Sequence, residues 1–575
     1  MIRDHALDFD DPITASEIQE RSLDNDFKSG SVRIAGDQIS FVYKTASEIG
    51  QLGDNTLVLR EAIKSDELLR QALTGGMASA IVVGHTRWAS IGIISEPNAH
   101  PLNSEQQGLK ELPYVVAAIN GDVDNFADLK DLENLAIAPA VTSDSKVMPT
   151  LMAQHLIKTD KGDRSINQAF RKTVDSLEGS VAVVANAASD PDNLHLALRG
   201  SGQGLYIGLA EDAYIVSSEP YGIVECTQKY LRINGESISS RSEFVSGPGE
   251  IISLSTENAG SIEGISRSSY DGVPLPISDE EIDFAGITSR DIDRRGYPHF
   301  LLKEITEAPE SFLKTLRGKI IEVNGNLDVR LEEGSFPFDL RKKFSEGGFK
   351  EIYVIGQGTA AVAGHSLASL LSEEISIRVV SLPSTELSGF HLRPDMSESF
   401  VIAISQSGTT TDTNRTVDLV RSRGASVVSI VNRRDSELTK KSDGVLYTSD
   451  GRDIEMSVAS TKAFYSQIAA GVLLAIKIAD SVNGPKVDIA STEKRNQLLH
   501  SLKDLPNLMR NVLSEQEKIA EIASELAPAK KYWAIVGNGL NIVAAKEIRI
   551  KLSELCYKSI AADFTEDKKH IDLSA

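Results

Sequence analysis

Cysteine is scarce in this sequence, which has only Cys226 and Cys556 among its 575 residues. Two cysteines so far apart form neither a disulfide framework nor a metal-binding cluster, so we expect a reduced, cytoplasmic setting without a metal site. No apolar run approaches the ~18 residues that cross a bilayer, and the N-terminal segment lacks the apolar stretch of a signal peptide. These absences argue against a secreted or membrane-spanning protein.

Basic residues are also in short supply, because 60 Lys and Arg face 82 Asp and Glu and the formal net charge is −22. Such a surface repels phosphate backbones and anionic lipid, so we expect no nucleic acid and no membrane among the partners. An anionic substrate must then be held by local dipoles. The hydrophobic share of 41% excludes wholesale disorder, and the length predicts about three or four domains.

Residues 1–255 have the pattern of an α+β domain with a largely antiparallel sheet. Their short apolar runs are separated by polar, glycine-containing turns. The runs lie at 80–84, 114–119, 180–184 and 213–216. Residues 256–299 are polar with scattered Pro, and we interpret them as an interdomain linker.

From residue 300 the pattern changes to strands that alternate with helices of a dozen or more residues. The apolar strand-like runs lie at 351–355, 377–380, 400–404 and 426–431. This alternation predicts an α/β domain at 300–485, with a doubly wound parallel sheet covered by helices on both faces.

A Gly-x-Gly pair suggests that this domain starts a second time. The pair at 356–358 returns at 537–539, each time after an apolar run and before an Ala-rich helix. Such self-similarity predicts a second copy of the domain at 490–575. Only 36 residues follow Gly539, and a sheet ended there would leave strand edges unpaired. We therefore expect the second copy to be truncated.

The sharpest chemical signal is the hydroxyl-rich loop that follows the apolar run at 400–404. It reads Ser405-Gln-Ser-Gly-Thr-Thr410 and precedes a helical stretch. Backbone N–H groups at a helix N-terminus favour an anion, and Ser405, Ser407 and Thr410 add hydroxyl donors. Helix capping is the simpler alternative, but four hydroxyls exceed what a cap needs. The loop predicts a site for a small phosphorylated metabolite.

The glycine pair Gly356 and Gly358 superficially matches a dinucleotide-binding fingerprint. A nicotinamide site needs an acidic residue at the end of the next strand, and here none occurs before Glu386. We therefore reject NAD and expect no organic cofactor. The pair instead indicates a close backbone approach to the same small ligand, with Thr359 as a donor.

A second cluster of polar residues lies in the first domain, after apolar runs or in loops rich in polar side chains. Its members are Arg87, Asn120, Gly121 and Asp144. Arg can clamp a carboxylate, Asn with the next N–H can form an oxyanion hole, and Asp can hold an ammonium group. These are the needs of an amino-acid amide site. An ion pair and an Asn-Gly turn explain the same residues equally well.

These motifs together resemble the glutamine–fructose-6-phosphate aminotransferase family over nearly the whole chain. The family has a class II glutamine amidotransferase domain followed by two sugar-isomerase (SIS) domains. The run Gly84-His-Thr-Arg-Trp88 is similar to the family's glutamine loop. The resemblance implies that Arg87 and Trp88 hold glutamine, that Asn120 and Gly121 form its oxyanion hole, and that Asp144 contacts its amino group.

The resemblance also implies roles for residues in the isomerase half. In the first SIS domain, phosphate would be held by Ser405, Gln406, Ser407 and Thr410, and the sugar would be touched by Val458 and Ser460. In the second, Glu554 would move a proton between sugar C1 and C2, with Lys551 beside it. Both lie with Glu547 on one helix face. His570 would open the sugar ring in the site of a partner subunit.

The implied reaction takes L-glutamine and fructose 6-phosphate to glucosamine 6-phosphate in a homodimer, without metal or cofactor. The chain departs from the family in lacking the N-terminal nucleophilic Cys and a C-terminal Lys. Loss of glutaminase activity or truncation at both ends explains this, and we favour truncation. We expect sugar phosphate binding without glutamine hydrolysis or complete sugar chemistry. The alternatives are a non-catalytic SIS sugar-phosphate sensor and an ammonia-dependent isomerase.

Overall fold

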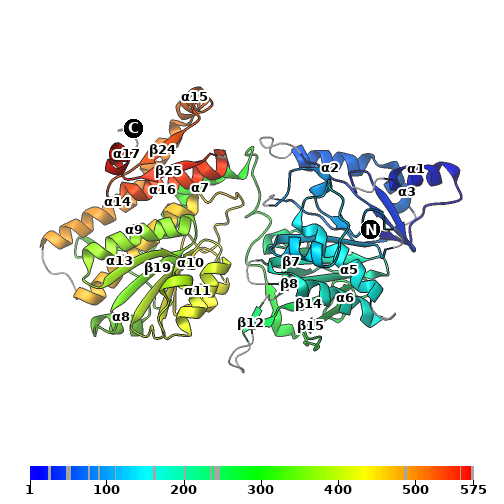
Figure 1. The fold of residues 1–575 in the computed structure, drawn as a ribbon. Coiled ribbons are helices and arrows are strands. Elements are labelled where there is room, and N and C mark those ends of the chain that lie inside the picture. Colours follow the sequence, from blue (N-terminus) through cyan, green and yellow to red (C-terminus); the bar gives the residue numbers. More distant parts are fainter. Residues whose placement is uncertain are drawn as a thin grey trace. The chain divides into compact units, whose positions relative to one another are not determined.

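The computed structural model divides the chain into two compact units, residues 1–285 and 286–575, which are described separately here (Figure 1). The structure describes residues 1–23, 27–46, 54–74, 78–87, 91–109, 112–158, 163–199, 203–233, 236–238, 246–434, 436–484, 489–556 and 558–571.

The first unit is built around a six-stranded antiparallel sheet. Its strand order is β15-β14-β8-β7-β6-β5. These strands are β5 (Leu102–Asn103), β6 (Val115–Val123), β7 (Gly179–Ala187), β8 (Asp190–Arg199), β14 (Glu250–Ser255) and β15 (Ile265–Ser269). Helices α5 (Val147–Lys158) and α6 (Asp163–Ser176) bury apolar side chains against one face of this sheet.

A second antiparallel sheet packs its apolar side chains against the other face. Its order is β10-β9-β11-β16, with β9 (Tyr206–Leu209), β10 (Tyr214–Ser217), β11 (Lys229–Arg232) and β16 (Ile282–Phe284). A smaller sheet holds β1 (Ile2–Arg3), β2 (Val32–Ala35), β3 (Gln38–Phe41) and β4 (Ser79–Ala80), and β12 (Glu236–Ile238) pairs with β13 (Ser246–Pro248). The remaining helices are α1 (Pro12–Ser22), α2 (Asp54–Ser65), α3 (Glu67–Leu73) and α4 (Phe126–Leu132). The predicted α+β class with antiparallel sheets is confirmed.

The segment expected to be a linker is largely part of the first unit. Strand β15 pairs with β14, and strand β16 pairs with β11 in the second sheet. The polar composition misled the prediction because these strands are short and lie at sheet edges, where only one side is paired and alternating polar residues are tolerated. The division between the units falls after Ala285 rather than after residue 255.

The second unit contains the predicted doubly wound sheet. Five parallel strands lie in the order β20-β19-β21-β22-β23. They are β19 (Glu351–Gly356), β20 (Arg378–Pro383), β21 (Ser399–Ser405), β22 (Ser426–Val431) and β23 (Gly444–Tyr447). Helices α8 (Phe338–Ser345), α9 (Thr359–Glu374) and α13 (Lys462–Asn483) cover one face, and α11 (Thr411–Arg421) covers the other. Helix α7 (Phe300–Leu316) packs on α13, and the unit also holds α10 (Ser384–Glu386), α12 (Glu437–Lys440) and the hairpin of β17 (Ile320–Val323) and β18 (Asn326–Val329).

Helix α13 corrects the expectation that the sequence holds no membrane-length apolar stretch. It is long and apolar enough to cross a membrane by length and composition alone, yet 72% of its most apolar window is buried inside the unit. It packs against α7, α8 and α9. Its apolar character therefore has a sufficient cause in the core of this unit.

The repeated glycine pair folds the same way twice. Strand β24 (Trp533–Val536) leads through Gly537 and Gly539 into α16 (Asn541–Cys556), as β19 leads through Gly356 and Gly358 into α9. A Cβ at Gly356 would lie 2.9 Å from the backbone of the following helix, and one at Gly537 would lie 2.4 Å from it. Gly358 and Gly539 have φ values of 55° and 53°, where a side chain is disfavoured.

The second copy is short within the described residues. Strand β24 pairs in parallel with β25 (Ile560–Asp563) alone, and α16 connects the two. Helices α14 (Ile489–Ser514), α15 (Gln516–Leu526) and α17 (Thr565–Ile571) complete this part. Helix α14 packs against α7 and β18 of the preceding part.

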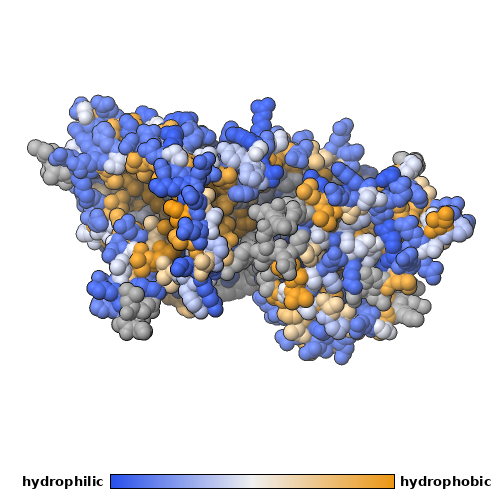
Figure 2. All heavy atoms as spheres, turned by 90° about the horizontal axis from the view of Figure 1, so that it is seen from above, coloured by the Kyte–Doolittle hydropathy of each residue, from blue (hydrophilic) through white to orange (hydrophobic). Residues whose placement is uncertain are grey.

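Figure 2 shows hydrophilic residues in blue and hydrophobic residues in orange interspersed on one face of the molecule.

The centre of the α8–α9–α13 face gives a stability prediction. Phe400 is fully buried, with ring centroids 4.9 Å from Phe344 and 5.2 Å from Phe349. We expect Phe400→Ala to lower the free energy of unfolding of this unit by about 3–5 kcal/mol, because it removes buried area and leaves a cavity. Urea denaturation of the full chain measures this. The control is Phe390→Ala, since Phe390 is 79% exposed; equal effects of the two variants would contradict the assignment of the core.

Candidate functional site

The hydroxyl-rich loop lies at the carboxyl end of β21, where the strand order of the sheet reverses. Strand β19 sits between β20 and β21, so the connections from β19 and β21 leave in opposite directions. In open α/β sheets this reversal forms a crevice that receives ligands. Gly356 ends β19 and Ser405 ends β21, and the register pairs Ile355 with Ala403. Both predicted ligand loops therefore open at the same edge of the sheet.

The loop's hydroxyl groups bond within the loop instead of capping the helix. The Ser405 Oγ accepts a hydrogen bond from the Gly408 N–H at 3.0 Å and lies 3.1 Å from the Thr410 Oγ1. The Ser407 Oγ accepts from the Thr409 N–H at 3.2 Å. Thr410 is the N-cap residue of α11, yet its side chain makes no capping hydrogen bond. The simple capping explanation therefore fails for Thr410.

The backbone turn at Gly408 keeps the loop compact. Its φ is 68°, and a Cβ there would lie 2.0 Å from the Ser436 Oγ. The Asn414 side chain closes the turn by donating to the Gly408 carbonyl at 3.1 Å and to the Thr410 carbonyl at 3.0 Å. Only glycine fits this conformation and contact. The loop is thus a fixed ring of hydroxyl and amide groups at the start of a helix.

The second copy reaches this edge of the sheet through α16. The Thr359 hydroxyl donates a hydrogen bond to the buried Glu547 of this helix at 3.0 Å. The same hydroxyl oxygen of Thr359 accepts a hydrogen bond from the Lys551 Nζ at 3.0 Å. Lys551 also lies 3.2 Å from Glu554. The predicted donor Thr359 and the predicted pair Lys551 and Glu554 are therefore brought together around one hydroxyl.

The two carboxylates of α16 have unlike surroundings. Burial of the Glu547 carboxyl group raises its pKa, while Lys551 and the Thr359 hydroxyl oppose that shift. The Glu554 side chain is 42% exposed. His570 lies on α17 with its side chain 75% exposed and 3.5 Å from Glu566. The described contacts bring Glu554 to the Thr359 hydroxyl through Lys551, and they place His570 at the surface.

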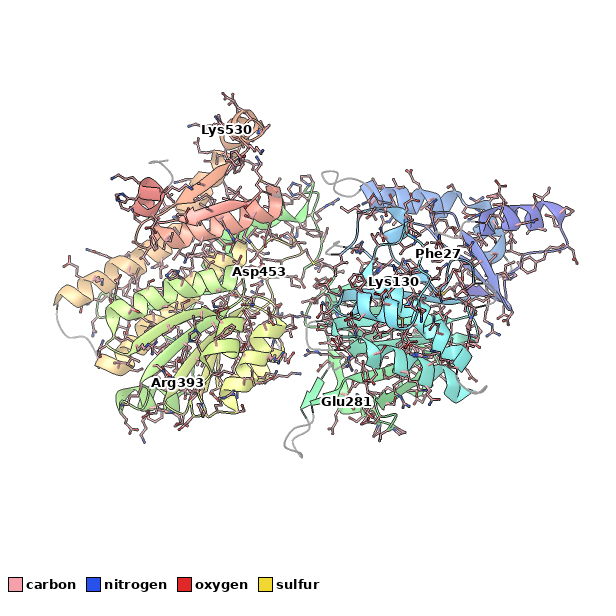
Figure 3. All side chains as sticks on the ribbon, in the orientation of Figure 1. Phe27, Lys130, Glu281, Arg393, Asp453 and Lys530 are labelled. Atoms are coloured by element: carbon pink, nitrogen blue, oxygen red, sulfur yellow. The ribbon has the colours of Figure 1, made fainter. Side chains whose placement is uncertain are left out.

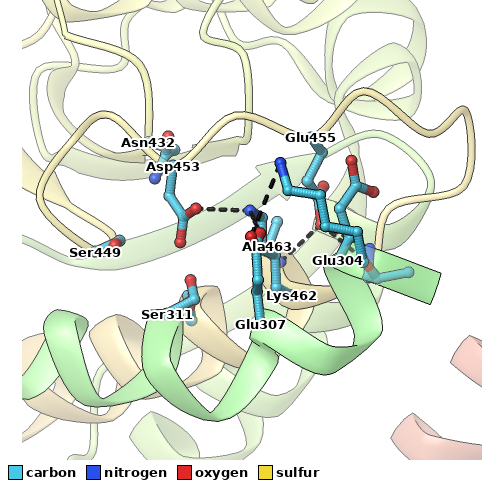
Figure 4. Close-up of polar contacts among 12 residues, drawn as sticks. Glu304, Glu307, Ser311, Asn432, Ser449, Asp453, Glu455, Lys462 and Ala463 are labelled. Atoms are coloured by element: carbon cyan, nitrogen blue, oxygen red, sulfur yellow. Dashed lines mark hydrogen bonds and ion pairs between the residues drawn. The ribbon is translucent and has the colours of Figure 1, made fainter. Parts of the chain in front are cut away.

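A third element of the candidate site is the segment 450–461 that joins β23 to α13 (Figure 4). It has no helix or strand, and it carries the predicted sugar contacts Val458 and Ser460. The Gln406 Nε2 donates to the Asp453 carbonyl at 3.0 Å, which ties this segment to the hydroxyl-rich loop. Ser460 donates to Glu455 at 2.8 Å. The residues predicted for phosphate and for sugar are thus neighbours.

In the first unit, the predicted oxyanion pair lies within a strand rather than in a hairpin turn. Asn120 and Gly121 belong to β6, and their partners on β7 are Ala182 and Val181. The Asn120 Nδ2 donates to the Gln203 side chain at 2.8 Å. Gly121 has a φ of 118°, and a Cβ there would lie 2.0 Å from the Ser180 carbonyl oxygen. The Asn-Gly turn alternative is therefore wrong.

Asp144 lies beside this strand with its carboxylate buried. It accepts a hydrogen bond from the Val123 N–H at 2.8 Å and is 3% exposed. Burial lowers the pKa of Arg87, while the carboxylates of Asp144 and Asp122 oppose that shift, so Arg87 lies within their electrostatic reach. The Arg87 guanidinium also donates to the Ile91 carbonyl. Trp88 falls outside the described residues.

A cavity of about 330 Å³ adjoins this group. Gly84, His85 and Thr86 line it together with Asn120, and apolar side chains of β7 and β10 complete its wall. His85 stacks on His100 with ring centroids 4.4 Å apart. Burial lowers the pKa of both imidazoles, and the nearby Arg87 guanidinium lowers it further. Among the described residues, no group of three or more metal-ligating side chains is found.

Sequence reasoning missed the charged side chains that hold segment 450–461 in place, namely the buried Glu304 and Lys462 and the half-buried Glu307 and Asp453 (Figure 4). Lys462 is 2% exposed and donates to Asp453 at 2.6 Å and to Glu307 at 2.8 Å. Nothing in the sequence indicated that Glu307, one of the two partners of Lys462, comes from a helix 155 residues away.

Comparison with known proteins gives a domain-family match and several similar proteins. The SIS domain family matches residues 349–477. The glutamine–fructose-6-phosphate aminotransferase [isomerizing] of Thermococcus kodakarensis is 28% identical over 523 residues, which cover 90% of this chain and 76% of that protein. The protein of the same name from Symbiobacterium thermophilum is 28% identical over 507 residues, with 87% and 74% covered.

Among solved structures, the C-terminal domain of glucosamine-fructose-6-phosphate aminotransferase from Francisella tularensis matches with 25% identity and a TM-score of 0.42. It covers 49% of this chain and 74% of that one. The aligned sequences of the two aminotransferases confirm the resemblance noted from the motifs. This chain contains a SIS domain and is similar, over about nine-tenths of its length, to the isomerising glutamine–fructose-6-phosphate aminotransferases.

Proposed function

We propose that the second unit binds fructose 6-phosphate at the switch point of its parallel sheet. The phosphoryl group sits on the loop of Ser405, Gln406, Ser407 and Thr410, where backbone N–H groups and the start of α11 favour an anion. The observation that carries this proposal is the ring of loop hydroxyls that the helix does not use as caps. The names of the similar proteins supply the identity of the sugar.

The sugar then lies between Thr359, segment 450–461 and the Lys551–Glu554 face of α16. Val458 and Ser460 contact it, and Glu554 moves a proton between C1 and C2, as in an aldose–ketose isomerisation. The partial exposure of Glu554 supports this role, because the base must reach the ligand. Glu547 holds Lys551 and Thr359 in place from its buried position. We assign His570 to the corresponding site of a partner subunit in a homodimer.

The first unit is proposed to recognise L-glutamine. Arg87 and Trp88 hold its carboxylate end, Asp144 its ammonium group, and Asn120 with the N–H of Gly121 its amide oxygen. The electrostatic proximity of Arg87 and Asp144 supports this arrangement. In the reaction of the aminotransferase family, glutamine is hydrolysed in this domain. The ammonia released is delivered to the sugar, which yields glucosamine 6-phosphate.

We expect Ser407→Ala and Ser405→Ala each to weaken binding of fructose 6-phosphate by about five- to tenfold. Each removes one hydrogen-bonding hydroxyl from the loop, and one such bond contributes about 1 kcal/mol net. Isothermal titration calorimetry measures the dissociation constant. The matched control is Ser422→Ala, since the Ser422 hydroxyl bonds only the end of its own helix α11. Unchanged affinity in both loop variants would refute the phosphate assignment.

We expect the 575-residue chain not to release ammonia from glutamine. Hydrolysis by this class of domain needs a cysteine thiolate beside the oxyanion pair, and the sequence has cysteine only at 226 and 556. Cys226 is exposed and follows the turn Pro220–Gly222 rather than the β6 strand. A coupled glutamate dehydrogenase assay tests this. Glutamine-dependent ammonia release by the wild-type chain would contradict the prediction. The Cys226→Ser variant would then show whether Cys226 is the nucleophile, because release would be lost in that variant only if it is.

A second function, a non-catalytic sugar-phosphate-binding protein, is favoured by the same placement of the two cysteines. Such a protein would bind the sugar phosphate with the same loop of Ser405–Thr410, but it would not convert the ligand into a product. Exchange of the C1 hydrogens of fructose 6-phosphate with solvent deuterium separates the two, since only the isomerase exchanges them.

A further inference from the structure

Segment 450–461 shows an unusual choice of exposed and buried side chains. Val458 is 77% exposed, whereas its neighbour Ala459 is 2% exposed. An isolated exposed valine is ordinary on a surface loop, but this segment is held by several hydrogen bonds to the carboxylates of the buried Glu304 and the half-buried Glu455. A fixed backbone that displays an apolar side chain next to polar groups has the character of a binding surface.

Three of these hydrogen bonds go to Glu304 of α7, whose side chain is buried with 1% exposed. Its Oε1 accepts hydrogen bonds from the Met456 N–H and from the Ser457 N–H, the latter at 3.1 Å. Its Oε2 accepts from the Ser457 hydroxyl. Three donors converge on one side chain, so the carboxylate acts purely as an acceptor, as an ionised carboxylate does.

This arrangement has an energetic cost that a merely structural contact would avoid. Burial raises the pKa of Glu304, and the three hydrogen bonds only oppose that shift. A buried ionised group is expensive, and an apolar contact between α7 and the segment would stabilise the fold at least as well. What the carboxylate does achieve is a defined backbone path for the two residues that precede Val458.

The other fastenings lead from the same segment to the hydroxyl-rich loop. Glu455 accepts from the Thr461 N–H at 2.7 Å and from the Ser460 hydroxyl at 2.8 Å, which fixes the end of the segment at the start of α13. Asp453 accepts from Lys462 through its carboxylate and from Gln406 through its carbonyl. Helix α7 therefore holds the segment at residues 456 and 457, and the loop proposed for phosphate contacts it at Asp453.

We propose that Glu304 is a positioning residue, whose three hydrogen bonds to residues 456 and 457 set Val458 and Ser460 against the sugar part of the ligand. The inference rests on the proposed binding of fructose 6-phosphate and deepens it. Glu304 touches no part of the loop of Ser405–Thr410 among its described contacts. It therefore acts on recognition of the sugar and leaves recognition of the phosphoryl group unchanged.

The test compares two ligands on the full chain, fructose 6-phosphate and inorganic phosphate, both followed by line broadening in ³¹P NMR. In Glu304→Gln an amide N–H₂ replaces one acceptor oxygen and faces hydrogen-bond donors, so the segment shifts. We expect the dissociation constant of fructose 6-phosphate to rise about tenfold, while that of inorganic phosphate changes less than twofold. The Ser407→Ala variant weakens both ligands.

The matched control is Glu310→Gln on the same helix, because the Glu310 side chain is 51% exposed and makes only long ion pairs of 3.8 and 3.9 Å. It should change neither affinity. If Glu304→Gln fails to fold, as judged by thermal unfolding, Ser457→Ala removes a single bond to Glu304 and should change the same ligand selectively, by a few-fold.

Three results overturn the proposal. Equal weakening of both ligands assigns Glu304 a general structural role, and unchanged binding of fructose 6-phosphate assigns it none. Each of these leaves the proposed function standing, since the wild-type chain still binds the sugar phosphate. A wild-type chain that binds neither ligand refutes the proposed function itself, and the role of Glu304 falls with it.

Discussion

The reversal of strand order between β19 and β21 is the constraint on which the candidate site depends. In a parallel sheet, all loops that carry ligand contacts leave from the carboxyl edge, and helices cover both faces. The loop after β21 and the glycine pair after β19 therefore meet without any direct sequence relation. An anion placed there sees backbone N–H groups and hydroxyls. This suits a chain whose net charge of −22 offers anions little long-range attraction.

Carboxylate side chains supply the hydrogen-bond acceptors that segment 450–461 lacks because it forms no helix or strand. Segment 450–461 has no regular backbone hydrogen bonding of its own, so its N–H groups need other acceptors. Glu304 and Glu455 supply them, and the Lys462–Asp453 pair ties the segment to the start of α13. Burial of the Glu304 carboxylate is costly, but its hydrogen bonds and those of Glu455 define the backbone path of an irregular segment. A defined backbone path is what a specific binding surface requires.

The contact between α9 and α16 explains why one chain carries two copies of a glycine-rich turn. Thr359 opens α9, and its hydroxyl bridges Glu547 and Lys551 of α16. Apolar side chains below it, Val362 and Ala363 of α9 with Ile542 and Val543 of α16, form a shared cluster. The first copy thus contributes the loop proposed to bind phosphate, and the second contributes ionisable groups at the same edge.

Much of this was readable in the sequence, because local patterns report local structure. Apolar periodicity gave the α+β and doubly wound classes, and the run Ser405–Thr410 identified its own loop. Where the pattern was weak the prediction failed: the polar segment that contains β15 and β16 looked like a linker, since short edge strands carry little apolar signal. The apolar helix α13 was underrated because only its packing shows that it is a core helix. The pairing of Lys462 with Glu307, the contacts of Glu304 and the bridge at Thr359 were decided by tertiary structure alone. They join residues more than a hundred positions apart, and no local pattern records which distant acceptor a donor will meet.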